Sequence, residues 1–268
     1  MEKQTAVFRD LGQMDYKAAW DYHESLLQKN VKIKSEARSG EPEILSQAAG
    51  IGSLEFTHIT EMEEGTHETE NLTTNHQPPT TNYLLFVEHP PVYTLGKSCK
   101  MENVLIGDKE REEKGIRFYR TNRGGDITFH GPGQIVGYPI LDLEKFYTDI
   151  GRYLRELEEV IILALAEYGI EAGRSPGETG VWIDPLVKGK ERKICAMGVR
   201  CSRWVTMHGF AFNVNTDLSY FNHIIPCGIQ NKKVTSLKEE LGRQVPLEEV
   251  KRKLKRNFEK VFHVDLEE

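Results

Sequence analysis

Residues 193–214 read KICAMGVRCSRWVTMHGFAFNV, and this stretch decides the fold. Two runs rich in apolar residues, 193–201 and 204–214, are separated by only two polar residues, Ser202 and Arg203. Short apolar runs joined by so short a connection predict an antiparallel β-hairpin. The chain is therefore expected to contain a β-sheet around which the other elements assemble.

Strands and helices are predicted on both sides of this hairpin. The apolar patterns indicate further strands at residues 5–9, 82–87, 116–120, 127–129, 135–141 and 180–183. Helices are predicted at residues 15–28, with Asp15 as N-cap, at residues 148–168, and from Pro246 to about Phe262. Strands interleaved with few helices, including an antiparallel hairpin, predict an α+β fold with mixed α/β sheets.

A segment of different composition interrupts this pattern. Residues 31–80 contain three Lys or Arg and nine Asp or Glu, and only 13 of their 50 side chains are hydrophobic. Such a segment buries too little apolar surface to offset the entropy of ordering it. We therefore predict a single domain over residues 1–268, with a mobile acidic insertion at about residues 31–80. Outside the insertion, positive and negative residues balance at 32 of each sign, so no basic surface for nucleic acid is expected.

The overall composition is typical of a globular protein, with 38% hydrophobic and 28% charged residues. No apolar run approaches the roughly 20 residues that span a bilayer, and the N-terminus lacks the apolar core of a secretory signal. A cytoplasmic protein without membrane contact is expected. Four irregularly spaced cysteines without a C-x-x-C pair predict neither a disulfide framework nor a metal site. The sequence leaves open a catalytic role for one of these four thiols.

A glycine-rich loop, RGGDITFHGPGQ at residues 123–134, lies between two predicted strands. Glycines let the main chain approach a ligand closely, so the loop is expected to wall a narrow pocket around His130. Gly131 and Gly133 are expected to hold the loop tight against the ligand. The plainer interpretation is a wide turn with a surface histidine. The loop is not a P-loop, because it contains no G-K-[ST].

Two further positions carry potential chemistry. Cys227 stands between a proline and a glycine, which suits a nucleophilic thiol, although cysteines more often act as small hydrophobic residues. Lys193 enters an apolar strand, where a desolvated lysine would activate a thiolate; alternatively its long stem reaches water. His89 and His130 are candidates to support catalysis, or else loop histidines that hold turns.

Four separated motifs occur together: EHPPVYTLG at residues 88–96, the loop at 123–134, KICAMGV at 193–199, and PCGI at 226–229 followed by VTSL at 234–237. In this combination the chain resembles the lipoyl(octanoyl) transferase family, also called lipoate-protein ligase B. The resemblance implies the catalytic fold of biotin and lipoate ligases, and an acyltransferase that moves an octanoyl group to a lysine in the first step of protein lipoylation. It also implies that Cys227 carries the acyl group as a thioester and that Lys193 lowers the pKa of this thiol.

The resemblance further implies partners and substrate contacts. The donor is acyl carrier protein, and the acceptors are lipoyl domains of 2-oxoacid dehydrogenase E2 subunits and the glycine cleavage H protein. No ATP or metal is used, and we expect a monomer. The motifs place the following residues around the substrate: Arg123, Gly124, Gly125, Asp126, Ile127, Thr128, Phe129, His130, Ala196, Met197, Gly198, Gly209, Phe210 and Ala211.

Three different functions are compatible with the same fold. An ATP-dependent lipoate or biotin ligase is disfavoured, because the glycine loop lacks a basic G-R-G-R-x-G run and such enzymes need no nucleophilic cysteine. An amidotransferase would pass octanoyl between lipoyl proteins, and a scaffold would only bind lipoyl domains. The chain departs from the family at Cys195, which we expect to react with thiol reagents, and around His23, which replaces a common glutamine.

Overall fold

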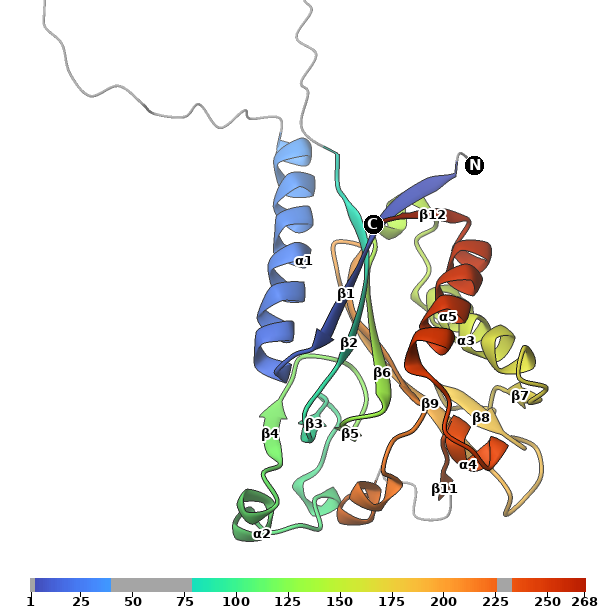
Figure 1. The fold of residues 1–268 in the computed structure, drawn as a ribbon. Coiled ribbons are helices and arrows are strands. Elements are labelled where there is room, and N and C mark those ends of the chain that lie inside the picture. The colour runs from blue at the N-terminus through green and yellow to red at the C-terminus, as the bar shows by residue number, and fades with distance from the viewer. Residues whose placement is uncertain (1–2, 40–78, 226–232) are drawn as a thin grey trace, which may run out of the picture.

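The computed structural model describes residues 3–39, 79–225 and 233–268. In this part, a β-sheet forms the middle of three layers (Figure 1). Helix α1 (Tyr16–Ser39) covers one face, and helices α3 (Ile150–Ala166) and α5 (Leu247–Phe262) cover the other. The strands of the sheet are β1 (Gln4–Gln13), β2 (Asn82–Glu88), β6 (Gln134–Ile140), β7 (Ala172–Gly173), β8 (Val181–Ile183), β9 (Arg192–Ser202), β10 (Val205–Asn213), β11 (Lys233–Val234) and β12 (Val264–Glu267).

Parallel and antiparallel pairs occur in the same sheet. The strand order is β12-β1-β2-β6-β10-β9-β8-β7, and β11 pairs with β9. β1 is parallel to both of its neighbours, whereas the pairs from β2 through β7 are antiparallel. This mixed sheet, with helices on both faces, confirms the predicted fold class.

The predicted hairpin is β9 and β10. Its register runs from the pair Val205 and Ser202 to the pair Phe212 and Cys195. The connecting residues Arg203 and Trp204 have φ of 49° and 65°. Positive φ at both central residues is typical of the two-residue turns whose twist matches that of the paired strands. The hairpin prediction is therefore confirmed.

A second, smaller sheet lies beside the large one. Its order is β4 (Arg117–Arg120), β3 (Val92–Leu95) and β5 (Ile127–His130). The sequence did not predict β3, because it has only four residues and directly follows two prolines. The remaining short elements are α2 (Asp108–Glu113), α4 (Leu237–Leu241) and 3₁₀ turns at Met101–Asn103, Leu143–Lys145 and Leu218–His223.

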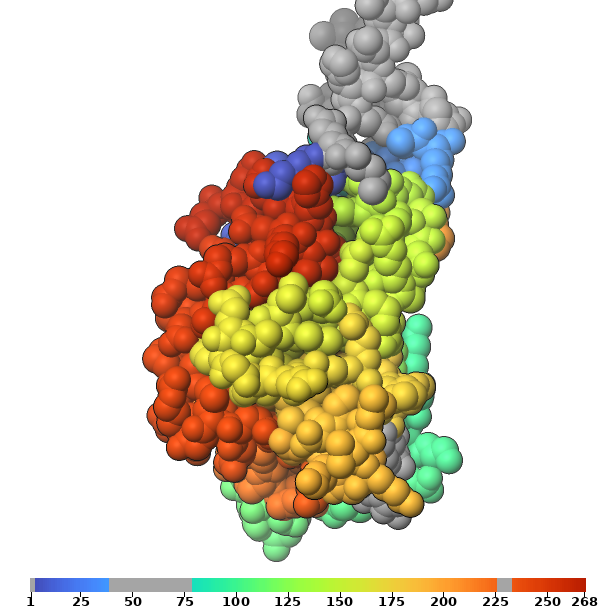
Figure 2. Space-filling model, turned by 90° about the vertical axis from the view of Figure 1, so that its right-hand side faces the viewer, coloured from blue at the N-terminus to red at the C-terminus, as the bar shows by residue number. Residues whose placement is uncertain are grey.

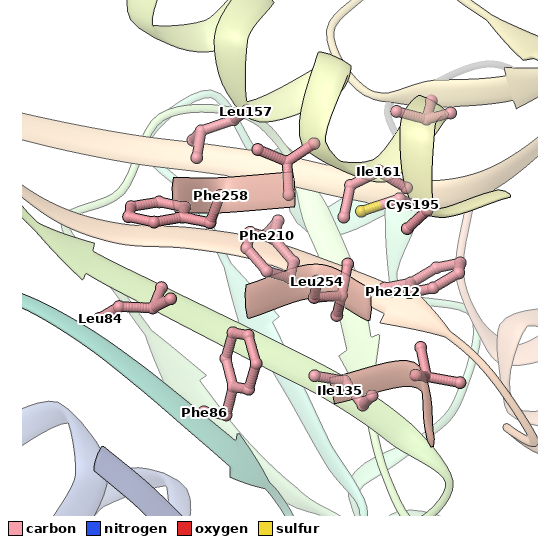
Figure 3. Packing of buried hydrophobic residues seen from close by; sticks show 14 of the residues in the cluster. Leu84, Phe86, Ile135, Leu157, Ile161, Cys195, Phe210, Phe212, Leu254 and Phe258 are labelled. Atoms are coloured by element: carbon pink, nitrogen blue, oxygen red, sulfur yellow. The ribbon is translucent and has the colours of Figure 1, made fainter. Parts of the chain in front are cut away.

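The largest hydrophobic core lies between the sheet and the helix pair α3 and α5. Phe86, Phe210 and Phe212 of the sheet face Leu157 of α3 and Phe258 of α5 (Figure 3). The outer side of this layer, with α3 in yellow beside α5 in red, is seen in Figure 2. A second core packs α1 against the opposite face of β2, β6 and β10. Both faces of the central strands are thus buried, which explains their nearly continuous apolar runs.

The predicted end of the first helix is wrong. Asp15 caps α1 as expected, accepting a hydrogen bond from the backbone N–H of Lys17 (3.0 Å), but the helix continues to Ser39 instead of ending near residue 28. Residues 31–39 therefore belong to the folded body and not to an insertion. Residues 40–78 lie outside the described residues, and a mobile insertion there stays a prediction.

A buried ion pair explains the extension of α1. The Lys34 ammonium contacts the Asp142 carboxylate, and each side chain is only 6% exposed. The same carboxylate accepts a hydrogen bond from the Thr80 hydroxyl (2.8 Å). The partner of Lys34 lies 108 residues away in the chain, so the local sequence does not reveal the ion pair.

We predict that Lys34→Ala destabilises the fold. Removing one partner leaves the buried Asp142 charge uncompensated, so the free energy of unfolding should fall by about 3 kcal/mol. Arg38→Ala is the matched control, because Arg38 is exposed and its ion pair with Glu144 is at the surface; the expected loss is below about 1 kcal/mol. Urea unfolding of both variants measures the difference. Equal losses would contradict a special role for the buried pair.

Candidate active site

A cavity of about 730 Å³ is lined by β6, β9 and β10 and by the first part of the glycine-rich loop, which forms the β4–β5 connection and β5 itself. The residues that the motifs placed around the substrate line this cavity, with one exception. They are Arg123, Gly124, Gly125, Asp126, Ile127, Thr128, His130, Ala196, Met197, Gly198, Gly209, Phe210 and Ala211. The structure thus brings together three motifs that are far apart in the chain. That these residues bind a substrate stays a prediction.

The exception is Phe129. Its neighbours Thr128 and His130 line the cavity, whereas the Phe129 ring packs in the core of the small sheet. There it is 1% exposed and stacks on Tyr220, with ring centroids 4.5 Å apart. Contact of Phe129 with a ligand stays a prediction.

Gly131 and Gly133 also lie away from the cavity wall. A Cβ at Gly131 would meet the Phe129 ring at 2.4 Å, and Gly133 has φ of +78° with Asn215 backbone beside it. Both positions require glycine because of local packing and backbone conformation. That Gly131 and Gly133 also hold the loop tight against a ligand stays a prediction.

Arg123 fixes the loop to its surroundings. Its guanidinium donates to the Thr94 carbonyl (2.6 Å) and to the Gly124 carbonyl (3.0 Å). The Gly124 N–H donates to the Val199 carbonyl of β9 (3.0 Å). A Cβ at Gly198 would lie 2.8 Å from the Gly124 oxygen, so only glycine permits this approach. The loop and β9 therefore form one rigid corner of the cavity.

Lys193 lies in the cavity wall near the start of β9. Its ammonium is 4.6 Å from the centroid of the Trp182 ring, a cation–π contact across the β8–β9 pair. On its other side Lys193 pairs with Val234 of β11, which also lines the cavity. The lysine that the sequence singled out is thus held between two strands and reaches the cavity.

Cys227 lies outside the described residues, so its predicted role is a proposal. The described chain on either side reaches the cavity, with Phe221 before this stretch and Val234 after it. The Ile225 N–H donates to the Asn103 carbonyl (2.9 Å), which fixes the last described residue before Cys227.

The other cysteines are poorly suited to nucleophilic chemistry. Burial raises the pKa of the Cys99 thiol to about 12 and also raises the pKa of the Cys201 and Cys195 thiols. Cys195 is 0% exposed and packs in the largest core (Figure 3). At neutral pH all three are protonated thiols. The expectation that Cys195 reacts with thiol reagents is therefore wrong.

Neither candidate histidine lies at the surface. His89 is 1% and His130 is 6% exposed, and burial lowers their pKa to about 4 and about 3, so both rings are neutral at pH 7. His130 lines the cavity, with Nδ1 2.8 Å from the side-chain oxygen of Gln134. His89 lies behind the wall, 2.8 Å from the Tyr138 hydroxyl. Catalytic support by either stays a prediction.

Tyr16, Tyr138 and His208 are among the cavity-lining residues that the sequence did not single out. His208 has φ of 58° within β10, a conformation that is uncommon outside glycine and marks a constrained position. The signal available in the sequence was a His-Gly pair inside an otherwise apolar strand.

Metal binding and membrane insertion find no support in residues 3–39, 79–225 and 233–268. No group of three or more His, Cys, Asp or Glu side chains in these ranges is arranged to hold a metal ion. No helix of the same described ranges combines the length and apolar character needed to cross a membrane.

The amino-acid sequence is similar to those of octanoyltransferases. An octanoyltransferase of Christiangramia forsetii is 53% identical over 270 residues, covering 99% of this chain and 99% of the relative. One of Cytophaga hutchinsonii is 44% identical, covering 98% of this chain and 95% of the relative.

Solved structures share the fold. A bi-partite lipoate protein ligase from Thermoplasma acidophilum has a TM-score of 0.62 at 18% identity, covering 99% of this chain and 86% of its own. Lipoate-protein ligase A bound with ATP has a TM-score of 0.61 at 16% identity, covering 100% of this chain and 88% of its own. The model of the lipoyl protein ligase A/B catalytic domain matches residues 66–259. With this match and relatives that are half identical over nearly the whole length, the chain belongs to the lipoyl protein ligase A/B catalytic domain family.

Proposed function

We propose that the chain is an acyltransferase that transfers an octanoyl group to a specific lysine of lipoyl domains. The observation that carries this proposal is a cavity with Lys193 at one end and small or apolar side chains along β9 and β10. Such walls can pack against an alkyl chain. The Lys193 ammonium can give a proton to the thiolate that leaves when the thioester is attacked. Relatives that are named octanoyltransferases and are 53% identical support the same substrate.

The proposed reaction has two steps. The Cys227 thiolate attacks the carbonyl carbon of an octanoyl thioester, and the donor thiolate leaves with a proton from the Lys193 ammonium. The amine of the acceptor lysine then attacks the enzyme thioester. Its proton passes to the neutral Lys193 amine, the Cys227 thiolate leaves, and a stable amide remains. Splitting the transfer into two steps avoids bringing donor, acceptor and enzyme together at once.

The small residues of the cavity support an alkyl substrate. A Cβ at Gly209 would lie 2.2 Å from the Gly137 oxygen, and a Cβ at Gly198 would meet Gly124. These glycines let three strands and the loop pack tightly, while the small side chains of Ala196 and Ala211 leave room in the cavity for an alkyl chain. Burying an alkyl chain there gains about 0.8 kcal/mol per methylene.

The octanoyl donor is acyl carrier protein, and the acceptors are lipoyl domains of 2-oxoacid dehydrogenase E2 subunits and the glycine cleavage H protein. The enzyme works in the cytoplasm as a monomer. It uses neither ATP nor a metal, because a thioester donor is already activated and needs no adenylate.

An ATP-dependent ligase is the second candidate, because lipoate-protein ligase A, which shares this fold, has been solved with ATP bound. One assay separates the two. The purified protein is mixed with an apo lipoyl domain and either octanoyl-acyl carrier protein or free octanoate with ATP and magnesium, and the mass of the lipoyl domain is measured. We expect octanoylation with the carrier protein alone. Modification only with octanoate and ATP would overturn the proposal in favour of the ligase.

A further inference from the structure

The backbone of Lys193 lies between two short strands. On one side it pairs with Trp182 of β8, at a point where the register of β8 and β9 shifts by one residue. A shift of this kind, a β-bulge, redirects a side chain and disrupts the local hydrogen-bond ladder. On the other side it pairs with β11, which has only two residues (Figure 1). Strand pairing alone therefore gives the Lys193 backbone little support.

Thr235, the residue after β11, adds the support that the short strand lacks. Its N–H donates to the Lys193 carbonyl (2.9 Å). Its hydroxyl donates to the Glu240 carboxylate (2.6 Å), which also accepts two hydrogen bonds from Arg192, the neighbour of Lys193 (2.6 Å each). Its carbonyl accepts from the side-chain amide of Asn213 on β10 (3.0 Å). Three groups of one buried residue are thus fixed, and one of them holds Lys193.

The orientation of the Asn213 amide follows from its partners. The Thr235 carbonyl only accepts, so the amide nitrogen of Asn213 faces it and the amide oxygen faces Gln134. That oxygen accepts from the Gln134 amide nitrogen (2.8 Å), which also donates to the Phe129 carbonyl (3.2 Å). Asn213 and Gln134 are 4% and 1% exposed, and both line the cavity. Both amides are therefore fixed in one orientation in the cavity wall.

The chain of hydrogen bonds continues from Gln134 to the glycine-rich loop. The side-chain oxygen of Gln134 only accepts, so the Nδ1 of His130 carries the proton and donates to it (2.8 Å). The Nε2 of this neutral ring then accepts from the Thr94 hydroxyl (3.3 Å), whose oxygen accepts from the Arg123 guanidinium (3.0 Å). Buried hydrogen bonds that point the same way polarise and strengthen one another. The last side chain of this directed series is Asn213.

We propose that Asn213 is a positioning residue for Lys193, which it holds through Thr235 and β11. This role rests on the proposed function, in which Lys193 gives and takes a proton. Loss of the Asn213 amide removes one of the bonds of Thr235 and leaves a buried carbonyl without that donor. Thr235 and the backbone of Lys193 are then expected to shift. A displacement of about 1 Å at a reacting group can cost about 100-fold in rate.

The test compares Asn213→Ala with Asn82→Ala. Asn82 is the matched control because it is 3% exposed and its side chain also donates one hydrogen bond, to the Thr5 carbonyl (3.1 Å), and accepts one, from the Asp142 N–H (3.0 Å). It lies at the start of β2 and does not line the cavity. Both variants should lower the melting temperature by similar amounts.

The catalytic measurement is kcat at saturating octanoyl-carrier protein, which removes any effect of the variant on donor binding. We expect kcat to fall at least tenfold in Asn213→Ala and less than twofold in Asn82→Ala, at a temperature where both are folded. Equal losses of kcat in the two variants would reduce Asn213 to a structural residue and overturn the proposal.

A pair of Thr235 variants tests the same contact if Asn213→Ala does not fold. Thr235→Val keeps the branched shape but loses the hydrogen bond to Glu240, whereas Thr235→Ser keeps the hydroxyl. We expect kcat to fall at least threefold in Thr235→Val and to recover to more than half of the wild-type value in Thr235→Ser. Equal kcat in the valine and serine variants would contradict a positioning role for this residue.

Hydrogen exchange of the Thr235 amide, followed by mass spectrometry, tests the contact without any transfer reaction. This amide should exchange at least tenfold faster in Asn213→Ala than in the wild type, and at the wild-type rate in Asn82→Ala. Unchanged exchange in Asn213→Ala, or faster exchange with the kcat of the control, would overturn the proposal. Failure of the proposed function would look different, since the wild-type protein itself would transfer no octanoyl group from the carrier protein.

Discussion

Replacement of Cys227 with alanine is expected to reduce octanoyl transfer to the lipoyl domain at least about 10³-fold. The cysteine is the proposed covalent carrier, and loss of a nucleophile leaves only the uncatalysed encounter of donor and acceptor. The initial rate of lipoyl-domain octanoylation, with octanoyl-carrier protein in excess, measures the effect. A circular dichroism melt shows that the variant is folded.

The other cysteines provide the matched controls. Cys99→Ala and Cys201→Ala should transfer octanoyl at nearly the wild-type rate, because burial raises the pKa of both thiols and keeps them protonated. Cys195→Ala removes a buried side chain from the core, so it should lower the melting temperature but not the transfer chemistry. A Cys227→Ala variant that keeps the wild-type rate would refute the covalent route.

Replacement of Lys193 with alanine is the second large effect, with an expected loss of about 10² to 10⁴ in transfer rate. A positioned acid and base typically contributes this much. In the proposed mechanism the Lys193 cation also favours the Cys227 thiolate, so its removal should raise the pKa of the Cys227 thiol. Half-maximal iodoacetamide labelling of Cys227 should then move up by about one pH unit or more.

Lys193→Arg separates proton transfer by Lys193 from the effect of its positive charge on the pKa of the Cys227 thiol. Arginine keeps the positive charge but does not give up its proton, so labelling of Cys227 should stay close to wild type while transfer stays slow. Lys190→Ala is the control, because Lys190 is exposed just before β9. If Lys193→Ala and Lys190→Ala lose the same small fraction of activity, Lys193 has no catalytic role.

The sequence predicted the parts of the fold that local pattern determines. The β9–β10 hairpin and helices α3 and α5 follow from periodicity, turn chemistry and capping, and each lies where expected. The extension of α1 did not follow, because it depends on the ion pair between Lys34 and the distant Asp142. A local sequence pattern carries no information on contacts of this kind.

In the candidate site, too, the residues marked by a local sequence pattern were predicted, and those that depend on distant contacts were missed. Motifs placed Lys193 and most of the glycine-rich loop correctly at the cavity, since they mark residue types that simple packing does not require. Phe129 is the one residue of this set that does not line the cavity, although its two neighbours in the chain do. His208 was missed because the His-Gly pair in an apolar strand was the only signal in its neighbours, and this pair reveals neither the positive φ of His208 nor its partner on α1.

The acyl-enzyme at Cys227 is the central claim, and intact-mass spectrometry of the enzyme mixed with octanoyl-carrier protein alone tests it most directly. We expect one added octanoyl group that hydroxylamine removes, as it does from thioesters, and that peptide mapping assigns to Cys227. The group should then pass to an apo lipoyl domain without ATP. An adduct on another residue, or rapid transfer with no enzyme adduct at any time, would contradict the account.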